Sequence, residues 1–136
     1  FMQREFADVS ALDQDQFLYP AFAASAHRVH LAGGHVGVGA HGDLPGLGTI
    51  WEIQAYVEGG WQPAEAIWAA TMGSAETIAR DDSLGSLVPG KVADLVVLAA
   101  NPAENIRSIE KPVHVMKDGH LYDGETLREH VLTRTP

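Results

Sequence analysis

The sequence predicts an α/β segment followed by a β segment. Helical spacing of apolar residues dominates the first half of the chain, which contains one short strand pattern. The second half consists of short apolar runs separated by turn residues. A helical pattern that ends at Gly33-Gly34 and is followed directly by a strand pattern is half of an α/β repeat. We therefore expect two structural parts, residues 1–80 and residues 81–136.

Four segments of the first part carry helical patterns: residues 19–31, 49–57, 63–72 and 74–79. Pro20 and Pro63 suit first turns, where the missing N–H removes no helix hydrogen bond. Thr49 is expected to cap the second helix, with Glu52 three residues later completing a capping box. Glycine pairs after the first two helices are expected to end them.

Residues 35–40 (HVGVGA) are expected to form a strand between the first two helices. The two valines would face one side of this strand, and the glycines would face the other together with His35 and His41. Glycine at alternate positions usually marks the close approach of other backbone or of a ligand.

The second part is divided by two turns. Pro89-Gly90 has the residues that a type II turn requires, and residues 93–98 then form an expected strand. Asp118-Gly119 suits a type I′ hairpin turn between two further apolar runs. We therefore expect a small β-sheet or sandwich in this part.

Charge and composition narrow the function classes. Eighteen acidic side chains against nine basic ones give a formal net charge of −9, which repels phosphate backbones, so nucleic acid is not expected as a partner. No run approaches the roughly 20 apolar residues that span a bilayer, so no membrane segment is expected. The absence of cysteine excludes disulfides, thiolate metal sites and cysteine nucleophiles, and it favours a cytoplasmic location.

His41 with Asp43 is the best candidate for chemistry. Both follow the expected strand, and residues just after strand ends carry the chemistry of α/β barrels. A histidine there can ligate zinc or transfer protons near neutral pH. On these residues alone, a hydrogen-bonded loop histidine is the simpler alternative.

The other histidines point less clearly to chemistry. His27 and His30 lie three residues apart and could share a metal, but HExxH is absent and a solvated helix face is the simpler interpretation. His114 and His120 flank the expected hairpin turn and are interpreted as surface polar residues. The stretch GLGTIW does not match GxGxxG, which argues against a nucleotide site, and the absence of GxSxG argues against a serine-hydrolase elbow.

One long run carries a family resemblance. The stretch GWQPAEAIWAATMGSAETIARDDSLGSLVPGKVADLVVL resembles the C-terminal signature of the metal-dependent amidohydrolase superfamily, which includes imidazolonepropionase-like and prolidase-like members. That signature has a helix that begins with proline and contains an Ala-Thr pair, then a Gly-Ser-Leu turn, then the Pro-Gly-Lys-x-Ala-Asp run. The stretch that follows, NPAENIRSIEKPVHVMKDGHLYD, is similar to the family's closing strand. The resemblance covers roughly residues 36–122.

The resemblance implies a (β/α)8 barrel and a small β-sandwich built from both chain ends. Residues 35–40 would be the eighth barrel strand, residues 1–80 would belong to the barrel, and residues 81–136 would belong to the sandwich. The family holds one or two divalent metals, often zinc, at the C-terminal mouth of the barrel, where they activate water for attack on C–N bonds. His41 would then be a metal ligand or a proton-transfer group at that mouth, with Asp43 in the same loop.

The chain departs from the family pattern in two ways. The family commonly has aspartate at the end of the eighth strand, whereas this chain has His41, and Asp43 could replace that aspartate only if the loop bends back. A full barrel needs about 250 residues. The family's HxH and its other metal ligands are also absent from this chain.

The sequence therefore predicts a C-terminal fragment of a metal-dependent hydrolase that acts on C–N bonds of a small-molecule substrate and is inactive alone. The divalent metal, zinc being the first choice, would be bound by the full-length protein. The alternative is a non-catalytic, self-associating module derived from this family. A third hypothesis is a small metal-binding or sensor domain that uses His27, His30 and His41. Under the first two, we expect homo-oligomers or association with the missing N-terminal portion.

Overall fold

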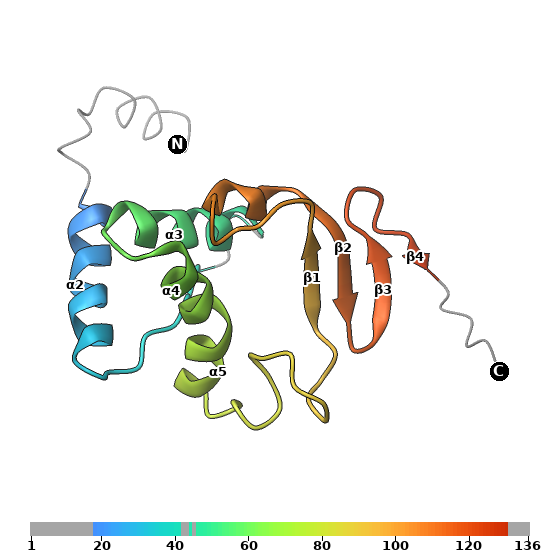
Figure 1. The fold of residues 1–136 in the computed structure, drawn as a ribbon, viewed down its shortest axis with the longest axis horizontal. Helices are drawn as coiled ribbons and strands as arrows, with labels where there is room; N and C mark the ends of the chain where they lie inside the picture. The colour runs from blue at the N-terminus through green and yellow to red at the C-terminus, as the bar shows by residue number, and fades with distance from the viewer. Residues whose placement is uncertain (1–17, 42–43, 45, 131–136) are drawn as a thin grey trace, which may run out of the picture.

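The computed structural model describes residues 18–41, 44 and 46–130, which form a group of helices beside a small antiparallel sheet (Figure 1). The helices are α2 (Tyr19–Leu31), α3 (Leu47–Glu58), α4 (Pro63–Trp68) and α5 (Ser74–Thr77), with a π-helical turn, Ala69–Gly73, between the last two. The strands are β1 (Leu95–Leu98), β2 (Pro112–Lys117), β3 (His120–Asp123) and β4 (Glu129–His130), and a 3-10 helix, Ile106–Glu110, precedes β2. The strands lie side by side in chain order. No helix of this described part is long and apolar enough to cross a lipid bilayer.

Local sequence rules account for most of the helix boundaries. The first expected helix is confirmed as α2, and the last two follow each other without a break through the π-helical turn. Helix α3 begins at Leu47, after Gly46 with φ 80°, so the prediction that Thr49 caps this helix is wrong. A carboxylate does cap α4, where Glu65 Oε2 accepts a hydrogen bond from the Gln62 N–H at 2.8 Å.

Trp61 organises the core between the helices. Only 2% of its surface is exposed, and its indole N–H donates to the Ala23 carbonyl at 2.9 Å. The Tyr56 ring stacks on it, with 4.7 Å between ring centroids. Ala66 and Ala69 are completely buried beside it, and their small side chains allow close packing. The core is therefore aromatic at its centre and lined by alanine.

Two histidines of α2 belong to this core. His27 and His30 stack on Trp61, with ring centroids 4.9 and 5.0 Å away, and Glu65 Oε2 lies 3.2 Å from His27 Nε2. The interpretation of these histidines as a solvated helix face is therefore wrong. Their spacing of three residues places them on the same side of the helix, and this side packs against the tryptophan.

The segment at residues 35–40 is extended but joins no strand among the described residues, so the expected strand is not formed there. Side chains from two helices hold its backbone instead. The Val38 N–H donates to Ser74 Oγ at 3.0 Å, and the Gly39 N–H donates to both oxygens of the Glu52 carboxylate at 3.1 and 3.2 Å. Glu52, expected in a capping box, thus serves this segment. Backbone groups that lack strand partners need such substitutes when they are shielded from water.

The Tyr56 hydroxyl makes a third contact of this kind, donating to the Gly37 carbonyl at 2.8 Å. Burial and the neighbouring Glu52 carboxylate raise the pKa of Tyr56, so its phenol stays protonated and remains a donor. Val36 and Val38 pack against the helical core, as their alternation predicts. The segment is therefore fixed by both apolar packing and hydrogen bonds.

The glycine pattern of the segment is only partly explained by close packing. A Cβ atom at Gly37 would lie 3.0 Å from Ser74 Cα and 3.2 Å from Thr77 Oγ1. Gly37 thus faces α5, although the expected alternation placed it on the side opposite the two valines, which also pack against the helices. A Cβ atom at Gly39 would meet no atom of the described structure within 4 Å. The segment is closely packed at the first glycine and open at the second.

Both expected turns of the second part are confirmed. Gly90 has φ 97°, and the Lys91 N–H donates to the Val88 carbonyl at 3.2 Å, as in a type II turn. Asp118 and Gly119 both have positive φ, 50° and 82°, as a type I′ hairpin turn requires. The described residues form one sheet layer here, so the second layer of a sandwich and the domain division at residue 80 stay predictions.

Two charged residues of the Pro-Gly-Lys-x-Ala-Asp run stabilise loops. Asp94 accepts hydrogen bonds from Lys117 Nζ and from the Asp118 N–H, both at 2.6 Å, which ties the start of β1 to the hairpin turn. Lys91 Nζ donates to the Leu84 carbonyl at 3.0 Å and so closes the loop before the type II turn. These side chains therefore have architectural roles in this chain.

Gly37→Ala should lower the free energy of unfolding by about 1–3 kcal/mol, the usual cost of overpacking, because the added methyl group meets the α5 backbone. Gly39→Ala is the matched control and should change it by no more than about 0.5 kcal/mol. Urea denaturation followed by circular dichroism measures both variants. Equal losses at the two positions would contradict the packing described for this segment.

Asp94→Asn should lower the melting temperature at neutral pH, because it removes the negative charge that interacts with Lys117. The amide keeps an oxygen acceptor, so the variant tests the charge itself. The Lys117 ammonium and the Asp118 N–H hold the pKa of Asp94 below its usual value. Its contribution is therefore present above the unfolded pKa, near about 3.9, and is lost as the pH falls through the lower folded pKa. Melting curves between pH 7 and pH 3 should show the gap between the variant and the parent narrowing. A gap that is constant with pH, or one that the exposed Asp82→Asn reproduces, would contradict this role.

Candidate functional site

His41 directly follows the extended segment and is exposed to solvent. The hydrogen bonds at Val38 and Gly39 fix the backbone just before it, so the position of the histidine depends on α3 and α5. Asp43, the second candidate, lies outside the described residues, and its approach to His41 stays a prediction. The structure thus places the imidazole at the end of a well-held segment, where a ligand can reach it.

His41 lies outside the two surface hollows found among the described residues. A surface hollow of about 510 Å³ beside α3 is lined by Tyr19, Trp51, Glu52, Gln54, Ala55 and Glu58. His41 lines neither this hollow nor the smaller one between α2 and α3. Glu52 brings a carboxylate to the same end of the segment, but this carboxylate already binds the Gly39 N–H. His41 therefore offers one accessible imidazole rather than a complete catalytic arrangement.

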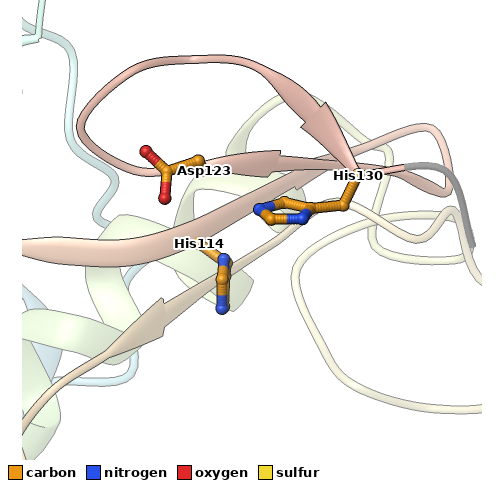
Figure 2. Close-up of side chains that lie close together, drawn as sticks. All are labelled: His114, Asp123 and His130. Carbon is orange, nitrogen blue, oxygen red and sulfur yellow. The ribbon is translucent and has the colours of Figure 1, made fainter.

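A second group of potential ligands lies on the sheet, where Figure 2 shows His114, Asp123 and His130 close together. His114 is half-buried, so its interpretation as a surface residue is wrong. The same interpretation is confirmed for His120, which is exposed and whose Nδ1 atom lies 2.7 Å from Glu129 Oε1. The hydrogen bond and the negative charge of Glu129 raise the pKa of His120.

Sequence reasoning missed this group, although part of it could have been found. A two-residue turn at Asp118-Gly119 fixes the register of the hairpin and makes His114 the direct partner of Asp123. His130 belongs to a third strand, whose register depends on the connection after Asp123. Asp123-Gly124 indicates a turn there, but β4 begins only at Glu129, so the dipeptide does not fix the register of His130 as a two-residue loop would.

Comparison with known proteins connects the chain to a group of hydrolases. Ochratoxinase from Aspergillus niger is 40% identical over 85 residues, which is 59% of this chain and 18% of the relative. An adenine deaminase from Desulforamulus reducens is 38% identical over 71 residues, which is 52% of this chain and 11% of the relative. The chain therefore spans less than a fifth of the length of these curated relatives.

Solved structures agree with the sequence comparison. A Xaa-Pro dipeptidase with bound methionine in its active site superimposes with a TM-score of 0.66 at 33% identity, covering 77% of this chain and 26% of that protein. The model of the Amidohydrolase family matches residues 27–122, which include the C-terminal end of α2, the extended segment with His41 and most of the sheet. Because this match covers well over half of the sequence, the chain belongs to the Amidohydrolase family.

Proposed function

We propose that this chain is the C-terminal portion of a metal-dependent hydrolase that cleaves C–N bonds of small molecules. One observation carries the proposal: the family match contains both the extended segment that ends in exposed His41 and the signature run that leads into β1. An adenine deaminase and a Xaa-Pro dipeptidase among the similar proteins support a reaction at a C–N bond.

The proposal assigns the rest of the active site to a larger protein. A (β/α)8 barrel needs about 250 residues, and the chain covers only 18% of ochratoxinase and 26% of the dipeptidase. The extended segment is consistent with this, because it joins no strand of the described sheet and its backbone bonds to helix side chains. Alone, the chain should therefore be inactive.

The described residues do not complete a metal site at His41. The group of three donors that they place close enough to hold one ion lies on the sheet and does not include His41. We therefore assign the remaining ligands of a catalytic metal to the rest of the protein. A divalent metal of this family supplies activation of the attacking water. This chain contributes an exposed imidazole that can bind the ion or accept a proton near neutral pH.

We also propose that the exposed apolar surface of the chain is buried against that missing portion. Large side chains that are more than half exposed occur on both halves: Phe22 and Leu31 on α2, Trp51 on α3, and Val96 on β1. Apolar surface of this kind commonly marks an interface. Homo-oligomers of the isolated chain would cover the same side chains. Light scattering distinguishes such oligomers from a monomeric chain.

His41→Ala in the full-length protein should lower kcat for hydrolysis of a C–N substrate by about 100-fold or more, the usual effect of losing a proton-transfer group. His120→Ala is the matched control, because His120 is an exposed histidine on the sheet and should leave kcat unchanged. Steady-state kinetics of the three proteins test the proposal.

Metal content, measured on the same preparations, separates the two roles of His41. Loss of metal from the His41→Ala protein would identify a ligand, and retained metal with lost activity would identify a proton-transfer group. Unchanged kcat would return His41 to an ordinary loop histidine. A full-length protein without hydrolase activity, together with self-association of this chain, would favour the non-catalytic module instead.

A further inference from the structure

Three side chains from β2, β3 and β4 lie close together on one face of the sheet (Figure 2). His114 on β2 and Asp123 on β3 are direct cross-strand partners and so share a face. His130 on β4 pairs with Leu121, which lies two residues before Asp123, so His130 shares that face as well. One donor atom from each of the three side chains lies within 4.8 Å of the other two.

Contacts within the described part of the chain do not satisfy all the hydrogen-bonding atoms of this cluster. The His114 Nδ1 atom is buried and has no hydrogen-bond partner among the described residues. A buried nitrogen without a partner is unfavourable and calls for a water molecule or an ion. The His130 ring approaches the His114 ring edge to face, with 5.3 Å between centroids, so the two imidazoles turn toward each other without a direct hydrogen bond.

The Asp123 carboxylate is held in place, but only one of its two oxygens accepts hydrogen bonds in the described part of the chain. Its Oδ1 atom accepts hydrogen bonds from the Thr126 N–H at 2.7 Å and from the Thr126 hydroxyl at 2.8 Å, whereas Oδ2 accepts none within the described part of the chain. The second oxygen of the carboxylate is therefore available as a ligand.

We propose that His114, Asp123 and His130 form a binding site for one divalent transition-metal ion of the zinc type, separate from the site at His41. Two imidazoles with one carboxylate suit zinc and its neighbours, whereas magnesium and calcium prefer oxygen ligands alone. Three protein ligands leave a fourth tetrahedral position for water.

The geometry requires a small contraction when the ion binds. Ligand atoms around tetrahedral zinc lie about 3.3 Å apart, so the present separations of up to 4.8 Å must shorten by about 1.5 Å at most. His130 is exposed and ends the short strand β4, so its ring is the part best able to move. A bound ion would link β4 to β2 across β3 and so fasten the edge of the sheet.

Isothermal titration of the 136-residue chain with zinc chloride tests the site. We expect one ion per chain, with a dissociation constant in the micromolar range or below. His130→Ala and Asp123→Asn should each weaken binding by about tenfold or more, because even the loss of a group behind a ligand costs that much. Asp123→Asn retains an oxygen acceptor for Thr126, so the turn should survive. His120→Ala, on the opposite face of the same sheet, should bind zinc as the parent does.

Residue-specific NMR distinguishes this site from a rival zinc site at His27 and His30 on α2. Zinc should shift the imidazole signals of His114 and His130 and leave those of His27 and His30 in place. Absence of binding at micromolar zinc, unchanged affinity of the His130→Ala chain, or shifts at His27 and His30 would each overturn the proposal. None of these measurements depends on the activity of a full-length hydrolase, so the site can fail or stand independently of the proposed function.

Discussion

The extended segment at residues 35–40 is held by hydrogen bonds with helix side chains and joins no neighbouring strand of the described structure. Ser74, Glu52 and Tyr56 each satisfy one backbone group of this segment, and its two valines pack against the helical core. This arrangement restrains the position of His41, because the histidine lies two residues after the last bonded residue, Gly39. It also explains how a strand-like sequence stays ordered where the described structure offers it no sheet.

The helical core around Trp61 supports this segment. Trp61 joins α2 and α3 through ring stacking and one buried hydrogen bond, Ala66 of α4 belongs to the same core, and the two valines pack against it. A hydrogen bond from Gln54 to Glu110 at 2.6 Å connects α3 to the 3-10 helix that leads into the sheet. In the signature run, Asp94 and Lys91 hold turns in place. The two charged residues of the family signature therefore have architectural roles in this chain, and the proposed chemistry is assigned to His41 together with residues outside the chain.

The sequence predicted those features that local rules decide. Helix α2 and the turns at Gly90 and Gly119 follow from proline placement and from the need for positive φ. The features it missed depend on distant partners. The strand at residues 35–40 fails to form because a strand needs neighbours, and Thr49 loses its capping role because α3 begins earlier, at a glycine. The pairing of His114 with Asp123 could be read from the hairpin turn, but the approach of His130 could not.

The central claim is that a longer polypeptide completes the active site around His41, and the DNA sequence upstream of the codon for Phe1 tests it most directly. The account predicts an in-frame extension that encodes further β/α repeats, with an HxH motif on an early strand and more histidines at later strand ends. Substrate screening would then be carried out on that full-length protein. A start codon close to Phe1, with no barrel-like sequence before it, would contradict the account and leave the proposed catalytic role of His41 unsupported.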